Sequence, residues 1–162
     1  MRFSIIAVLL FASIGWADEP VWSIGSANQP LADGARALLG DRYEEGIRLT
    51  LIGLKIASNK KEEEIALSNL CAGYTNMGDY STALKYCDML QKRNDGLWRV
   101  HASKALIYVY TKQYGLAEES LIKGESLNPG AHSLKVARAL YLDATQPVQP
   151  EIHVDDRQNR EQ

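Results

Sequence analysis

The 162-residue chain lacks the sequence signatures by which most enzymes are identified. It contains no glycine-rich phosphate loop, no nucleophile elbow and no Cys-x-x-Cys motif. Its three histidines, His101, His132 and His153, lie far apart, without the spacing of metal ligands. Although Asp155 and Asp156 follow His153 closely, we interpret that stretch as a solvated tail. These absences predict a non-enzymatic protein with no catalytic residues, no metal site and no cofactor.

The chain also lacks a charge excess of either sign and a strand pattern. Eighteen Lys and Arg residues face 20 Asp and Glu residues, which gives a net charge of −2. Without a basic stripe, nucleic acid is not expected as a partner. No segment alternates apolar and polar residues in the way that a half-buried strand does. We therefore predict an all-α fold.

Only one long apolar run is present, and it lies at the N-terminus. Arg2 precedes the apolar residues 3–14, and Gly15 with Ala17 then forms a small-x-small cleavage pattern before Asp18. The run is shorter than the ~20 residues that span a bilayer, although an uncleaved anchor or a buried helix is an alternative. No Cys stands at the cleavage site to accept a lipid. We predict an exported protein, periplasmic or secreted, with no stable membrane insertion after signal cleavage.

Helical spacing fills the stretch between this signal and the C-terminal tail. Apolar residues recur every three or four positions after Asn59, which forms a capping-box variant with Glu62. Gly78 is expected to end this helix, because glycine accepts the positive φ of a helix C-cap. Later helices are expected at 98–111, 114–127 and 133–142. The predicted segments are a signal peptide at 1–17, an extended N-terminal segment at 18–26, a helical domain at 27–143 and a flexible tail at 144–162.

One pattern recurs at a fixed spacing. Tyr74, Tyr80 and Ala83 return as Tyr108, Tyr114 and Ala117, each 34 residues later. An earlier copy starts at Tyr43, which lies 37 residues before Tyr80, so three additional residues are expected in the polar connection at 58–64. This alignment places Gly46 at the position of Ala83. Small residues at this position would let two paired helices cross closely.

The spacing of Tyr74, Gly78, Tyr80 and Ala83 resembles the tetratricopeptide repeat (TPR), a helix–turn–helix unit of about 34 residues. The same holds for the second copy, in Ala105, Tyr108, Tyr114, Ala117 and Pro129. The resemblance implies an α-solenoid of about three TPR-like repeats and a closing C-terminal helix across 27–143. Three unrelated helical hairpins are the alternative.

In the TPR family, the first helix of each hairpin lines a concave groove that receives a peptide or protein segment. Matched by position, the resemblance assigns to such a groove Asn69, Asn76, Arg99, Ser103 and Tyr110. Ile65, Ser68, Ala72, Ala102 and Leu106 fall on the same helix faces. Asn69 and Arg99 stand where chaperone-binding members hold a C-terminal carboxylate, but the rest of that clamp is not matched.

The resemblance thus implies a protein–protein interaction module, an adaptor or scaffold, with another protein or peptide as its partner. The alternative function is a structural subunit of a cell-envelope assembly that packs through its convex face or its terminal helix. An apolar exposed face on that helix would favour the alternative. Such a face would be formed by Leu134, Val136, Ala137 and Leu140.

The two cysteines lie on either side of one predicted turn. Cys71 precedes Gly78 by seven residues, and Cys87 follows it by nine. In an antiparallel hairpin these positions reach a similar height and both face inward. An exported protein meets an oxidising compartment, where such a pair can form a disulfide if the Cα atoms lie within about 7 Å. Free Cys is also an ordinary buried residue, so a disulfide and two buried thiols are both consistent with the sequence.

Overall fold

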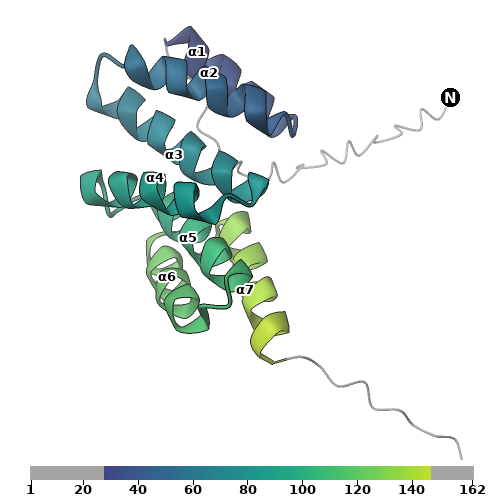
Figure 1. Ribbon diagram of the computed structural model, residues 1–162. Helices are drawn as coiled ribbons and strands as arrows, with labels where there is room; N and C mark the ends of the chain where they lie inside the picture. Colours follow the sequence, from purple (N-terminus) through teal and green to yellow (C-terminus); the bar gives the residue numbers. More distant parts are fainter. Residues whose placement is uncertain (1–27, 147–162) are drawn as a thin grey trace, which may run out of the picture.

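The computed structural model describes residues 28–146, which form seven α-helices and, within that range, no strand (Figure 1). The all-α prediction is confirmed. The helices are α1 (Gln29–Leu39), α2 (Tyr43–Lys55), α3 (Lys60–Met77), α4 (Tyr80–Arg93), α5 (Trp98–Tyr110), α6 (Tyr114–Leu127) and α7 (His132–Thr145). No helix among them is both long and apolar enough to cross a membrane. The predicted signal peptide at 1–17 and the segment at 18–26 lie outside the described residues, as does the tail beyond Gln146.

The ends of the helices follow from local side-chain chemistry. The Asn59 side chain accepts a hydrogen bond from the Glu62 N–H at 3.0 Å, and Asp79 accepts one from the Thr82 N–H at 3.1 Å. The Glu62 carboxylate returns to the Ser58 N–H at 2.8 Å, one residue before the position that a standard capping box uses. Gly78 ends α3 with a φ of 79°, as the sequence predicts.

The helices pack as consecutive pairs that form two layers. Figure 1 shows α1 with α2, α3 with α4 and α5 with α6 following one another through the molecule, with α7 against the last pair. The odd-numbered helices also contact one another in succession, α1 with α3, α3 with α5 and α5 with α7. The backbones of α2, α4 and α6 do not approach one another in this way within residues 28–146. The odd-numbered helices therefore form the layer with the more continuous contacts.

The hydrophobic core is a row of clusters, each shared by neighbouring helix pairs. One cluster joins the first three helices through Leu38, Ile47 and Leu70. A second lies among α3, α4 and α5, and a third lies among α5, α6 and α7. Each pair thus buries its apolar surface against the next pair along the chain.

Small residues lie where paired helices approach most closely. A Cβ atom on Gly46 would lie 2.5 Å from Leu38 Cγ, and one on Gly34 would lie 3.0 Å from the Gly46 carbonyl oxygen. Ala83 and Ala117, at the positions that correspond to Gly46 in the next two pairs, are completely buried. At these crossings a larger side chain would push the two helix axes apart.

A disulfide joins the middle pair of helices. Cys71 of α3 and Cys87 of α4 are bonded, with their Cα atoms 5.0 Å apart. Both residues are buried in the cluster that also contains Leu67 and Leu90. Of the two alternatives that the sequence allows, the structure contains the bonded one.

Candidate functional site

The five residues that the resemblance assigns to a groove do not lie together on one surface. Asn69 is completely buried and Ser103 is only 3% exposed, so both belong to the packing between α3 and α5 and their neighbours. Asn76 and Tyr110 are exposed at the C-terminal ends of these two helices. The Tyr110 ring stacks on Tyr80 of α4, with the ring centroids 5.7 Å apart. Arg99 lies apart from them, at the N-terminal end of α5.

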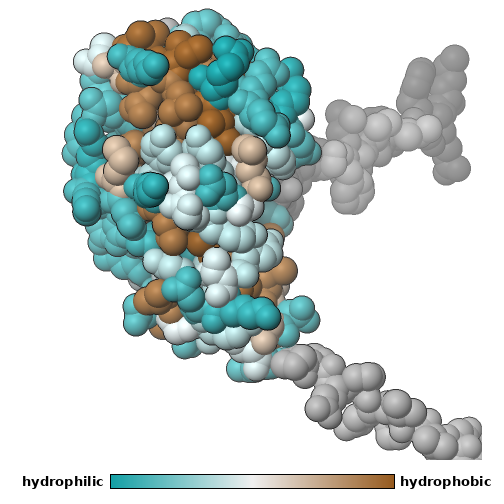
Figure 2. Space-filling view, in the orientation of Figure 1, coloured by the Kyte–Doolittle hydropathy of each residue, from teal (hydrophilic) through white to brown (hydrophobic). Residues whose placement is uncertain are grey.

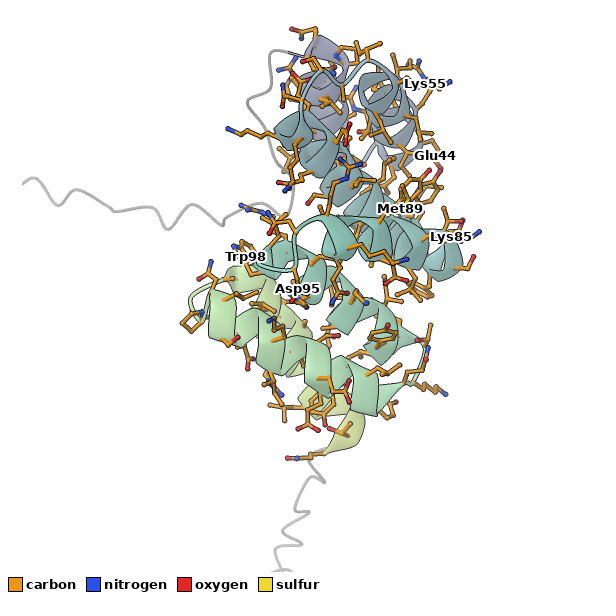
Figure 3. All side chains as sticks on the ribbon, turned by 90° about the vertical axis from the view of Figure 1, so that its left-hand side faces the viewer. Glu44, Lys55, Lys85, Met89, Asp95 and Trp98 are labelled. Atoms are coloured by element: carbon orange, nitrogen blue, oxygen red, sulfur yellow. A yellow bond between two sulfur atoms is a disulfide. The ribbon has the colours of Figure 1, made fainter. Side chains whose placement is uncertain are left out.

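Arg99 lines a pocket between the N-terminal ends of α3 and α5. The pocket has a volume of about 160 Å³. Small-molecule sites usually measure about 300 Å³ or more, so this one has room for a single large side chain. Its lining consists of Lys61, Glu64, Ile65 and Ser68 of α3, with Leu97 and Arg99 at the start of α5. Figure 3 labels Trp98, the neighbour of Arg99, at this end of α5.

The two cations of this pocket have no acidic partner among residues 28–146. The Arg99 guanidinium stacks over the Trp98 ring at 4.6 Å, and its Nε atom is buried without a hydrogen-bond acceptor. Lys61 forms no ion pair within the same range. The pocket's one carboxylate, that of Glu64, is already contacted by Lys60 Nζ at 3.6 Å and by the Asn94 amide at 3.4 Å.

This arrangement selects a particular ligand chemistry. A buried N–H without an acceptor costs free energy, so the Arg99 guanidinium has hydrogen-bonding capacity that residues 28–146 do not use. Arginine binds a carboxylate through two parallel hydrogen bonds, which fixes the orientation of the ligand. The apolar part of the lining, which we call the apolar floor, consists of Ile65 and Leu97 and suits an apolar side chain. The pocket therefore fits an acidic group next to an apolar one.

A larger pocket of about 320 Å³ lies among α4, α5 and α6. Its charged groups already have partners. Lys104 Nζ donates to Asp88 at 2.9 Å and to the Gln91 side chain at 2.7 Å. Lys123 lies 3.2 Å from Asp95, whose label in Figure 3 marks the connection between α4 and α5.

Hydrogen bonds from Gln91 and then from Lys123 lower the pKa of Asp95, so this carboxylate stays charged inside its network. His101 Nε2 lies 3.0 Å from the Asp95 carbonyl oxygen, which can only accept, so this nitrogen carries the proton. Because these groups satisfy one another, the larger pocket is the weaker candidate for a binding site.

Part of the pocket between α3 and α5 could have been found in the sequence. Lys61 precedes Ile65 and Ser68 on one face of α3, at positions i, i+4 and i+7. Extending the face that the resemblance assigns to the groove by one turn would have included Lys61. Leu97 gives no such signal, because it precedes α5 and is brought to the pocket by the connection from α4.

No group of three or more His, Cys, Asp and Glu residues that could hold a metal ion occurs in the described part of the chain. Comparison with known proteins gave no match: no protein-family model, no curated protein and no solved structure is similar to the chain.

Proposed function

We propose that the helical pairs are three TPR-like repeats of an α-solenoid and that α7 is the closing helix. The first residues of α2, α4 and α6 support this assignment, because all three are tyrosines: Tyr43, Tyr80 and Tyr114. Three residues after each tyrosine stands a buried small residue at the helix crossing. The succession of contacts among the odd-numbered helices is also that of a solenoid with a concave inner face.

We propose that the protein is a non-enzymatic adaptor that binds an extended peptide or protein segment through the pocket between the N-terminal ends of α3 and α5. The observation that carries the proposal is the pair of cations, Arg99 and Lys61, without acidic partners around the apolar floor of the pocket. The ligand would place one apolar side chain on Ile65 and Leu97 and an adjacent carboxylate on Arg99. A preformed pocket on packed helices keeps the ordering cost of binding low.

We further propose that the protein is exported and works in the periplasm or outside the cell. The buried disulfide supports this location, because such bonds persist in oxidising compartments and are rare in the cytosol.

A set of labelled nine-residue peptides would test the groove. Each peptide carries one Leu or Trp beside one Glu, and its matched controls carry Gln for Glu or Ser for the apolar residue. We expect the Glu-containing peptides to bind the intact protein and both control sets to bind more weakly. Replacing Arg99 with Met keeps the apolar stem but removes the charge, and should weaken binding about tenfold or more, because hydrogen bonds to charged groups contribute about 1.5–3 kcal/mol.

Lys135→Ala is the matched control, because Lys135 is an exposed cation on α7, away from the pocket. Equal binding of Glu and Gln peptides, or equal binding by the Arg99→Met variant, would contradict the proposal.

The alternative proposal is a structural subunit of a cell-envelope assembly that packs through its convex face or terminal helix. Exposed apolar side chains on or next to the even-numbered helices favour it, among them Ile52 of α2, Ile56 at the C-cap of α2 and Ile122 of α6. Figure 2 shows apolar surface gathered over α1 and α2. On α7 the support is limited, because Leu134 and Ala137 are buried and Leu140 is half-buried, while Val136 is exposed.

Native electrophoresis of envelope extracts separates the two functions. If the convex face docks, an Ile52→Ser/Ile56→Ser variant would no longer migrate in a high-mass complex, whereas an Arg99→Met variant would still do so. The opposite pattern would favour the groove.

A further inference from the structure

The described chain begins close to the N-terminal end of α3, the end that contributes residues to the pocket between α3 and α5. The Asn28 amide donates to the Gly53 carbonyl at 2.8 Å, which ties the start of α1 to the end of α2. The Asn28 side chain is also among the groups that hydrogen-bond the Glu62 carboxylate at the start of α3. Glu62 is adjacent in sequence to Lys61, which lines the pocket. Asn28 therefore lies close to the N-terminal end of α3, the end of this helix that contributes Lys61 to the pocket.

The sequence just before Asn28 has the chemistry that the pocket selects. Residues 18–27 read Asp-Glu-Pro-Val-Trp-Ser-Ile-Gly-Ser-Ala, with two acidic residues, three large apolar residues and no basic residue. Asp18 and Glu19 complement the two unpaired cations, and Trp22 complements the apolar floor. The segment thus matches the ligand inferred above in both charge and apolar character.

We propose that residues 18–27 dock in the pocket between α3 and α5, where they compete with the partner segment. This inference rests on the proposed function, because it names an internal competitor for the same site. Trp22 lies six residues before Asn28, so an extended chain reaches about 20 Å from that point. A tether of this length gives a local concentration on the order of millimolar. A partner must therefore bind tightly enough to displace the segment.

A peptide added in trans measures this competition. The probe is a labelled synthetic peptide with the sequence of residues 18–27, titrated into the full-length chain and into its Trp22→Ala variant. We expect the Trp22→Ala variant to bind the probe about tenfold more tightly than the unmodified protein. If the segment binds the pocket with a dissociation constant of ~0.1 mM and its internal copy has an effective concentration of ~1 mM, competition weakens the apparent affinity of the probe by about this factor. Ile152→Ala, which replaces an apolar residue of the other terminal segment, should bind like the unmodified protein. Adding Arg99→Met to the Trp22→Ala variant should abolish this gain in affinity for the probe.

The possible outcomes distinguish this inference from the proposed function. Equal affinity of the unmodified protein and the Trp22→Ala variant, with loss on Arg99→Met, would overturn internal docking while supporting a peptide site in the groove. No binding of the probe to any variant would also overturn the inference. The peptides with paired Glu and apolar residues test the groove independently, since their sequences do not derive from this chain.

Discussion

The first two helix pairs achieve the same close packing by different means. In α1 and α2 the helices approach because side chains are missing, at Gly34 on one helix and Gly46 on the other. In α3 and α4 a covalent bond joins Cys71 and Cys87, and the rings of Tyr74 and Tyr86 stack with centroids 5.5 Å apart. The stability of the α1–α2 pair should thus be sensitive to larger side chains at the two glycines, and that of the α3–α4 pair to reduction of the disulfide. The comparison shows that two helix pairs of one chain can pack closely through different residues at the contact.

Removal of the disulfide should have the largest effect. Its two cysteines are separated by 16 positions, and in the chain-entropy model a loop of about that length contributes about 3 kcal/mol. We expect Cys71→Ala/Cys87→Ala to lower the free energy of unfolding by about this amount in urea titrations. A reductant should lower the Tm of the unmodified protein but not that of the variant. Equal urea midpoints for both proteins would show that the middle pair is held by packing alone.

A methyl group added to the first pair should have the next largest effect. In Gly34→Ala the new Cβ would meet Thr50 Oγ1 at 2.5 Å and backbone atoms of Gly46 and Thr50 at 3.0 Å. Backbone atoms cannot rotate away, so we expect a loss of about 1–3 kcal/mol in thermal or urea unfolding.

Gly115→Ala in α6 is the matched control, because nothing lies within 4 Å of its Cβ position. This substitution should be neutral or should stabilise by up to about 1 kcal/mol. If both substitutions had the same effect, the close contact of α1 and α2 would not explain the glycine at position 34.

The junction of α6 with α7 extends the comparison to an ion pair. Arg138 donates to both carboxylate oxygens of Glu125, at 2.9 and 2.7 Å, and these hydrogen bonds lower the pKa of Glu125. A lowered carboxyl pKa contributes stability that is complete above the unfolded pKa of about 4.3 and is lost as the pH falls through the folded pKa.

Between pH 6 and pH 3 the unmodified protein should therefore lose more stability than Glu125→Gln. The difference should stay below about 1 kcal/mol, because the pair is partly exposed. Parallel pH profiles of the two proteins in urea would contradict this role.

The helix boundaries could be predicted because their signals are local. The helix expected at 114–127 coincides with α6, and α3 ends at Gly78, as the glycine at this position predicts. The pocket could not be predicted to the same extent. Asn69 and Ser103 fall on the helix faces that the resemblance assigns to the groove, yet both are buried among the packed helices. Likewise, Arg99 lacks an acidic partner because no other described helix brings a carboxylate within ion-pair distance of it. The spacing of residues within α5 cannot predict this.

The two layers of helices differ in stiffness as a consequence of their contacts. The odd-numbered helices touch in succession, whereas the even-numbered ones are joined only through them. We therefore expect the helix pairs to separate more easily at the even-numbered helices than at the odd-numbered ones. Motion between the pairs would therefore change the spacing of α2, α4 and α6 more than the spacing of α3 and α5. We expect the pocket between α3 and α5 to keep its width during such motion, because it lies in the layer whose helices contact one another in succession.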